Sequence, residues 1–219
     1  MNLTLRSCTC GAAGLLVLAL MPATAQALPV ISELFYDAVG SDDGLSFVEL
    51  HGAPGTSLTG LTLEGVNGAN GAVGPSLALT GEIPADGIFV VADATAGGQT
   101  SVAGADLLLD FDFQNGPDSV VLRAGSVIQD ALGYGVFAPG EVFAGEGAPA
   151  ADPAAGASLA RRFADVDTDD NAADFVALDA PTPGSAPLSA VPEPASAPLL
   201  GAGLAGLAAG CGRRRRNRG

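Results

Sequence analysis

Closely spaced aspartates in the last quarter of the sequence have the chemistry of a calcium loop. Five fall within ten residues: Asp165, Asp167, Asp169, Asp170 and Asp174. Carboxylate oxygens at alternate positions suit Ca²⁺. The EF-hand pattern is incomplete, because Asp170 stands where the turn needs glycine and Val176 stands where the bidentate glutamate belongs. Two interpretations follow: a solvated acidic turn that orients its own backbone amides, or a weak calcium site.

Two further acidic groups have residue types that bind cations or act as paired catalytic carboxylates. The first contains Asp37, Asp42, Asp43 and Glu49, and the second contains Asp106, Asp110 and Asp112. The first group is interpreted as a solvated loop and the strand after it. The three side chains of the second group would point to the same face if residues 106–112 formed a strand. Glycoside hydrolysis would further require a defined carboxylate separation.

The only histidine, His51, directly follows a predicted strand and is interpreted as a surface residue at the strand end. Glu49 lies two residues before it, but no Gly-x-Ser-x-Gly motif supplies a nucleophile. A zinc site needs three or four protein ligands, so one histidine without a cysteine does not indicate one. We therefore predict a non-enzymatic protein without a cofactor, apart from weak calcium, and rank a secreted hydrolase third.

The charge balance is strongly acidic. The 219 residues carry a formal charge of −15, with no lysine and no tryptophan. Residues 28–190 alone hold 23 acidic residues and three arginines, which gives −20. Such a domain repels nucleic acid, keeps a secreted protein hydrated and attracts divalent cations diffusely. With so few cations present, Arg161 and Arg162 are expected to matter for structure, with Glu33 and Glu49 as buried partners.

The N-terminus has the three parts of a secretory signal peptide. Arg6 is basic, residues 11–20 are apolar but too short to span a bilayer, and Ala25-Gln26-Ala27 is an A-x-A cleavage site. Signal peptidase should therefore remove residues 1–27 as the chain is exported. All three cysteines, Cys8, Cys10 and Cys211, lie outside residues 28–190, so no disulfide is expected in the exported domain.

The C-terminus places a polar motif, an apolar span and a basic end in that order. Val191, Pro192, Glu193 and Pro194 precede the apolar residues 195–212, and residues 213–219 contain five arginines. The arginines should stay on the cytoplasmic side, with the preceding domain outside. Eighteen residues give about 27 Å of helix, barely the hydrocarbon thickness. The span is rich in Ala and Gly, so its hydrophobicity is marginal for permanent residence.

This tail resembles the PEP-CTERM sorting signal of bacteria. The resemblance implies transient anchoring in the inner membrane, recognition by an exosortase-type membrane protease, and delivery to the cell surface or the extracellular matrix. An ordinary C-terminal membrane anchor is the alternative interpretation.

Residues 28–185 alternate apolar and polar residues over short windows, which is typical of β-strands. Gly, Pro, Asn and Asp recur between the windows at intervals of roughly 8–12 residues, a spacing typical of an antiparallel sandwich or barrel. The predicted strands are 30–36, 46–50, 58–66, 76–80, 88–91, 119–123, 126–132, 158–163 and 175–178, while 107–113 is strand or loop. Ala124-Gly125 is the clearest hairpin turn.

The sequence thus predicts an all-β domain in 28–185 between a signal helix and a hydrophobic helix. Residues 138–157 should form a long surface loop. Residues 179–190 should form an extended linker that is too proline-rich to fold, and 186–194 links the domain to the tail and carries the sorting motif.

Several segments of the domain are similar to lamin tail domains. They are Pro29–Leu34 with Tyr36-Asp37, Phe47–Leu50, Leu58–Leu63, Asn115–Leu122, Asp130–Gly135, Ser158–Arg162, Asp167–Phe175 and Pro181–Gly184. The resemblance implies an immunoglobulin-like antiparallel β-sandwich that acts as a non-enzymatic module of surface and secreted proteins. Two positions depart from the family: Gly60-Leu61 replaces a frequent Gly-Trp, and His51-Gly52 replaces a common Asn.

The function predicted from these features is a non-catalytic surface or matrix module. The alternative is a calcium-assisted binding or adhesion domain for an extracellular polysaccharide. The absence of tryptophan and the presence of only two tyrosines argue against a lectin that stacks aromatic rings on sugars.

Overall fold

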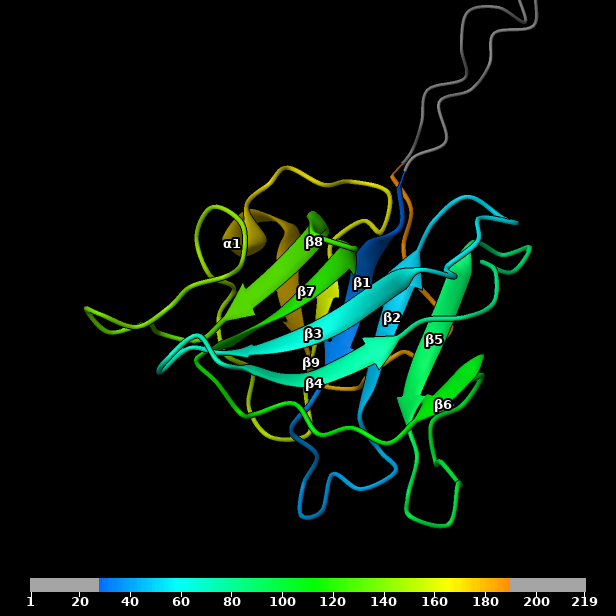
Figure 1. The fold of residues 1–219 in the computed structure, drawn as a ribbon, viewed down its shortest axis with the longest axis horizontal. Helices are drawn as coiled ribbons and strands as arrows, with labels where there is room; N and C mark the ends of the chain where they lie inside the picture. The colour runs from blue at the N-terminus through cyan, green and yellow to red at the C-terminus, as the bar shows by residue number, and fades with distance from the viewer. Residues whose placement is uncertain (1–27, 190–219) are drawn as a thin grey trace, which may run out of the picture.

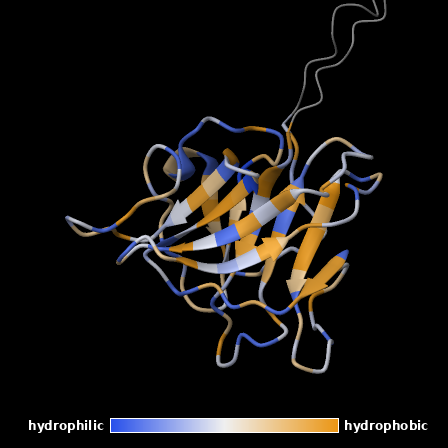
Figure 2. Cartoon of the chain, viewed as in Figure 1, coloured by the Kyte–Doolittle hydropathy of each residue, from blue (hydrophilic) through white to orange (hydrophobic). Residues whose placement is uncertain are grey.

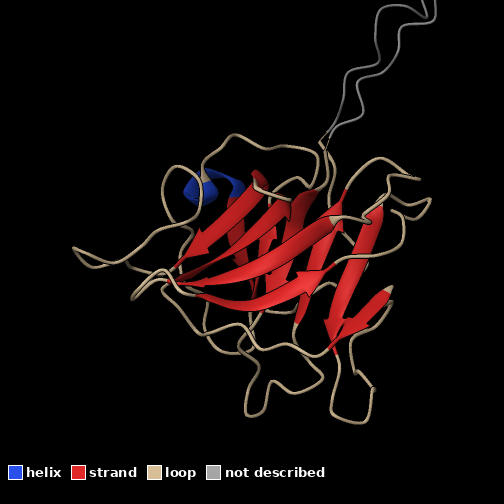
Figure 3. Cartoon of the chain, viewed as in Figure 1, coloured by secondary structure: helices blue, strands red, loops and turns tan. Residues whose placement is uncertain are grey.

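Alternation of apolar and polar residues produces ten strands in residues 28–189, the part of the chain that the computed structural model describes (Figures 1 and 3). The strands are β1 Val30–Phe35, β2 Phe47–His51, β3 Leu61–Asn67, β4 Val73–Ala78, β5 Ile88–Asp93, β6 Leu107–Leu109, β7 Asp118–Ala124, β8 Val127–Tyr134, β9 Ser158–Arg161 and β10 Phe175–Leu178. Within the same residues there is a single four-residue helix, α1 Asn171–Asp174, which precedes β10. The all-β prediction is confirmed for these residues.

The strands form two sheets. The six-stranded sheet has the order β10-β9-β1-β2-β5-β6, and the four-stranded sheet has the order β4-β3-β7-β8. Every neighbouring pair is antiparallel except β5 and β6, which run parallel. The purely antiparallel prediction is therefore wrong at β6. Residues 94–106 form a connection long enough to bring the chain back in the same direction.

The main hydrophobic core lies between the two sheets. Val48 and Leu50 from β2 face Leu63 and Leu122 from the four-stranded sheet, and all four are fully buried. Phe47 lies on the opposite face of β2, in a second hydrophobic cluster. That cluster, which includes residues of loop 94–106, covers the outer face of the six-stranded sheet over β2 and β5. β5 is thus buried on both faces, and Figure 2 shows it hydrophobic along nearly its whole length.

A β-bulge in β1 sets which of its residues face the core. The pairing with β2 shifts between Ile31 and Glu33, which places Ser32 at the irregularity. Ile31 and Leu34 both enter the core although they are three residues apart. Ser32 and Glu33 therefore both reach the outer face, where a regular strand would place only one of them.

Two strand boundaries differ from the prediction. The β7–β8 hairpin turns at Gly125 and Ser126 instead of Ala124-Gly125, because Ala124 pairs with Val127. Gly125 has φ +59°, the left-handed conformation that such a turn requires. β4 begins at Val73, three residues before the predicted strand, because residues 73–78 pair with β3 across a second bulge.

The segment predicted as a free linker is extended but docked along the domain. We call residues 179–189 the strap. Thr182 and Gly184 donate hydrogen bonds to carboxylates of the six-stranded sheet. Ala186 packs on the outer hydrophobic cluster, and the Ala164 N–H donates to the Pro187 carbonyl. The prolines stiffen the strap but do not prevent it from docking. The Glu33 and Glu49 carboxylates and the Ala164 N–H bind it.

The remaining predictions fall on residues 1–27 and 190–219, which lie outside the described residues. They include the Ala25 and Ala27 cleavage site, the Val191–Pro194 motif, the hydrophobic helix and the arginine tail. Within residues 28–189, no helix has the length and hydropathy needed to cross a membrane.

Candidate functional site

A buried arginine organises the acidic loop. Arg161 is the last residue of β9 and is 1% exposed. Its Nε donates to the Ile31 carbonyl at 3.0 Å, and its Nη2 donates to both carboxylate oxygens of Asp130 at 3.1 Å. Its Nη1 donates to the Val166 carbonyl, Asp167 Oδ1 and Asp174 Oδ2. The guanidinium also lies 4.6 Å from the centre of the Phe175 ring.

This arrangement supplies what a buried guanidinium requires. A charge removed from water is tolerated only when ion pairs and hydrogen bonds replace its hydration. Arg161 receives a bidentate carboxylate from β8 and a second buried carboxylate from Asp174. All three of its side-chain nitrogens are engaged, so this arginine holds β1, β8 and the acidic loop together and has no donor left for a substrate.

The structure assigns separate roles to the five predicted calcium ligands. Two of them, Asp167 and Asp174, converge on Arg161. Asp174 also accepts hydrogen bonds from the Thr168 N–H and Oγ1. The structure therefore brings two of the five carboxylates together, around a cationic side chain.

The other three predicted ligands lie apart from that pair. Asp170 is the N-cap of α1 and accepts hydrogen bonds from Ala172 N and Ala148 N. Asp165 accepts two hydrogen bonds from Ser189, and these bonds lower the Asp165 pKa. Asp169 has φ +55°, which a turn accommodates most readily with Asp, Asn or Gly.

Asn171, which directly follows the predicted ligand Asp170, connects the acidic loop to β8 and to the preceding long loop. It is fully buried. Its Oδ1 accepts from the Gly133 and Glu146 N–H groups, and its Nδ2 donates to the Ala131 carbonyl. One amide side chain thus replaces backbone pairing among three segments, which is typical of buried asparagine.

A group of three carboxylates lies beside Arg161. Oxygens of Asp130, Glu146 and Asp167 all lie within 4.8 Å of one another. Both oxygens of Asp130 already accept from Arg161, and Glu146 Oε2 is buried and receives no hydrogen-bond donor from the described residues. Burial raises the pKa of Glu146 to about 8, with further contributions from Asp130 and Asp167. We therefore treat Glu146 as the protonated member of the group.

The sequence identified only Asp167 among these three residues. Asp130 could have been identified from the sequence. It stands two residues before the core residue Leu132 in a predicted strand, so its side chain is on the inward face. A polar residue at an inward strand position needs a partner. The burial of Glu146 could not be predicted from the sequence, because this residue lies in a loop rich in Ala, Gly and Pro.

The predicted partners of the arginines were wrong. Glu33 accepts from Ser158 Oγ and from the N–H and Oγ1 of Thr182. Glu49 accepts from Ser32 Oγ and Gly184 N. Both carboxylates lie on the outer face of the six-stranded sheet, whereas Arg161 shares the inner face with Leu159. The pleat separates the two sets.

Arg162 and His51 lie apart from the carboxylate group beside Arg161. Arg162 is exposed, and its Nε donates to the Ala173 carbonyl. His51 is the last residue of β2, one residue beyond the predicted strand, and it is partly buried instead of exposed. Burial lowers the His51 pKa, and the neighbouring Asp165 carboxylate opposes that shift.

The other acidic groups are also divided among separate sites. Asp42 and Asp43 line a polar cavity of about 350 Å³ with Asp110 and Asp112. Burial raises the Asp112 pKa there.

The remaining members of those groups bind main-chain or side-chain donors elsewhere. Asp37 accepts from Asn115, and Asp106 accepts from the Val90 N–H. β6 covers only residues 107–109, so residues 106–112 do not form the single strand that alternation required.

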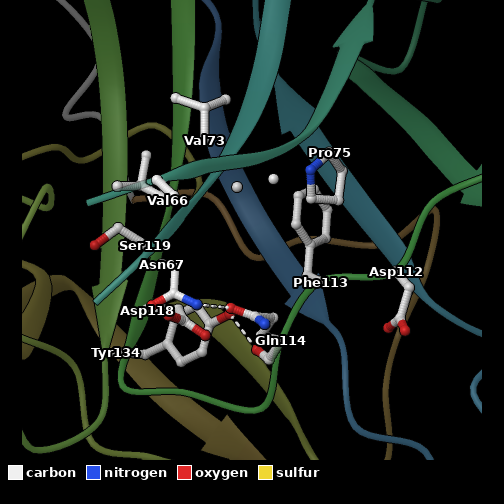
Figure 4. A pocket seen from close by; sticks show the side chains of 13 residues that line it. Val66, Asn67, Val73, Pro75, Asp112, Phe113, Gln114, Asp118, Ser119 and Tyr134 are labelled. Carbon is white, nitrogen blue, oxygen red and sulfur yellow. Dashed lines mark hydrogen bonds between the residues drawn. The ribbon is translucent and has the colours of Figure 1, made fainter. Parts of the chain in front are cut away.

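A cavity of about 280 Å³ lies where segment 112–114 crosses β3 and β4 (Figure 4). Val66, Val73 and Phe113 form apolar walls. Asn67 Nδ2 donates to Gln114 Oε1, and Figure 4 shows this pair joined by a dashed line. The Tyr134 hydroxyl donates to the Gln114 carbonyl at 2.8 Å. These polar atoms bind one another, so they fix the crossing segment on the sheet.

Comparison with family models, curated proteins and solved structures finds no match to this chain.

Proposed function

We propose that this protein is a non-catalytic β-sandwich module that is exported and displayed at the cell surface or in the extracellular matrix. Signal peptidase removes residues 1–27, and an exosortase-type membrane protease processes the tail at the Val191–Pro194 motif. The domain is then delivered outside the cell.

The observation that carries the proposal is that the two ends of the domain lie next to each other. Figure 1 shows both described ends leaving from one region of the sandwich. Ser189 binds Asp165, Asp165 lies close enough to His51 to influence its pKa, and His51 pairs with Val30. During export, the signal peptide and the C-terminal apolar span would hold both ends of the domain at the membrane. Ends that lie on one side of the domain allow this and leave the loops on the opposite side facing away from the membrane.

The two-sheet architecture supports the finer proposal of an immunoglobulin-like sandwich related to lamin tail domains. Segments that resemble that family fall on β1, β2, β3, β7, β8 and β9 in order. The role of the carboxylates supports a non-catalytic module, because Glu33, Glu49 and Asp174 each hold structural donors.

Intact-mass analysis of the surface-released protein tests the proposal. The full chain is expressed with and without an exosortase-type protease. We expect a released species that begins at Leu28 and ends near the Val191–Pro194 motif, and we expect it only with the protease. A Glu193→Ala variant should remain in the membrane fraction. A full-length chain in the cytosol would contradict the proposal, and a mature chain that keeps residues 195–219 would indicate an ordinary anchor.

A calcium titration tests the alternative of a calcium-assisted binding domain. We expect the melting temperature to change by less than about 1 °C up to about 10 mM Ca²⁺, because four of the five predicted ligands, all except Asp169, already accept hydrogen bonds within the domain. A site with a Kd of about 1 mM would add about 1.4 kcal/mol at that concentration, or about 3–5 °C. Mg²⁺ at equal ionic strength is the control. A calcium-specific rise of that size would favour the calcium-assisted alternative.

A further inference from the structure

A third cavity, of about 770 Å³, lies along β10, the edge strand of the six-stranded sheet. We call it the β10 groove. It is lined by Gly135, Val136, Phe137, Phe143, Pro149, Ala150, Ala151, Arg162, Ala172, Phe175, Val176 and Ala177. β10 ends its sheet, so the groove lies beside a strand that has a strand partner on one side only. Val136 is 88% exposed at its rim.

The charge of the β10 groove is opposite to that of the rest of the domain. Residues 28–190 hold 23 carboxylates, yet no lining residue is acidic and one is an arginine. Arg162 Nε donates to the Ala173 carbonyl. Within residues 28–189, Arg123 and Arg161 form ion pairs and Arg162 forms none. The groove therefore presents a cation beside a large apolar surface.

The aromatic walls of the groove are fixed before any ligand binds. The Phe143 ring lies so close to Gly133 and Gly145 that a side chain at either glycine would collide with it. Phe137 packs edge-on against Phe143 with ring centres 5.2 Å apart. Phe175 is held beneath the Arg161 guanidinium. Pre-formed apolar cavities with few polar groups are typical of small-molecule sites.

We propose that the β10 groove binds an amphiphile with an unbranched aliphatic chain and one carboxylate. Arg162 pairs with the carboxylate, and the chain lies over the partly exposed rings of Phe137 and Phe143, while Phe175, which is 4% exposed, also lines the groove. Two observations favour this ligand over an added peptide strand. β10 is only four residues long, so it offers few backbone hydrogen bonds, and the lining is dominated by apolar side chains. The proposal does not depend on the export route proposed above.

Calorimetric titration of the folded domain with octanoate, decanoate and dodecanoate tests this assignment. Each titration is carried out below micelle formation and in about 0.15 M salt, which screens the acidic surface. We expect a decanoate Kd on the order of 0.1–1 mM. Affinity should rise about fourfold for each methylene that enters the groove. Decyltrimethylammonium should bind more weakly at this site because Arg162 repels it.

Two variants and their matched controls locate the binding. Arg162→Gln should weaken decanoate about threefold to fivefold, whereas Arg123→Gln on β7 should leave it unchanged. Ala177→Glu places a carboxylate at an exposed lining position and should weaken binding more than tenfold. Ala96→Glu, which lies on an exposed loop, should have no effect. An affinity that does not change with chain length would overturn the proposal. An equal loss of decanoate affinity in the variants and their controls would also overturn it. Tighter binding of an uncharged extended peptide that decanoate does not displace would instead indicate strand addition.

Discussion

Replacing Arg161 by methionine should lower the free energy of unfolding by about 3–5 kcal/mol. The methionine fills most of the volume but leaves the side chains of Asp130 and Asp174, which are at most 4% exposed, without their cation. Breaking a buried ion pair by removing one partner costs this much because the remaining charge is uncompensated. Typical domains are stable by 5–15 kcal/mol, so the loss is a large share of the total. Urea denaturation followed by circular dichroism measures it.

Companion variants separate this effect from a general loss of charge. Arg123→Met removes a pair with Glu64 that is 21–25% exposed, and should cost no more than about 1 kcal/mol. Arg161→Lys keeps the charge but cannot span both oxygens of Asp130 while binding Asp174, so an intermediate loss is expected. Adding Asp130→Asn to Arg161→Met should recover part of the loss, because it removes one unpaired charge. Equal losses in Arg123→Met and Arg161→Met would contradict this account.

Strand positions could be predicted from the sequence where alternation was regular. β2, β5, β7 and β10 lie within two residues of their predicted ends, because apolar residues on one face and turn residues at the ends define such strands. β1 shows the limit of that method. Its bulge places Ile31 and Leu34 on one face, and no two-residue period describes a strand with an inserted residue.

The candidate site could be predicted only in part, because its members are brought together by the fold. The acidic spacing identified Asp167 and Asp174, and the scarcity of cations correctly marked Arg161 as structural. The bidentate partner, Asp130, lies 31 residues away on the other sheet. Choosing between Asp130 and Glu33 requires knowing which face of β9 carries Arg161, and that depends on how the sheets pack.

The strap shows a related limit. Its proline content correctly excluded helix and strand, yet Thr182 and Gly184 bind two buried carboxylates 135 or more residues earlier in the chain. Composition describes the conformations that a segment disfavours. It does not describe the acceptors that a folded surface offers to that segment.

Glu146→Gln should make the domain more stable than the wild type at alkaline pH by about 2 kcal/mol, with little difference at pH 5. Burial, Asp130 and Asp167 raise the folded-state pKa of Glu146 to about 8, against an ordinary value of 4.5. The folded protein therefore holds a proton that the unfolded chain releases between these values. The stability contributed by this group is fully present below about pH 4.5 and is lost as pH rises through about 8.

The magnitude is well below the full shift, because the Glu146 side chain is partly exposed and solvent screens its neighbours. Glutamine keeps the neutral shape and does not titrate, so the difference between variant and wild type isolates this one carboxyl from other buried acids such as Glu49. Urea denaturation at pH 5, 7 and 8.5 gives that difference. Glu82→Gln, an exposed position, should show no pH-dependent difference. Parallel stability curves for wild type and Glu146→Gln from pH 5 to 8.5 would show that Glu146 holds no proton beside Asp130, and the three carboxylates would then need another counter-charge.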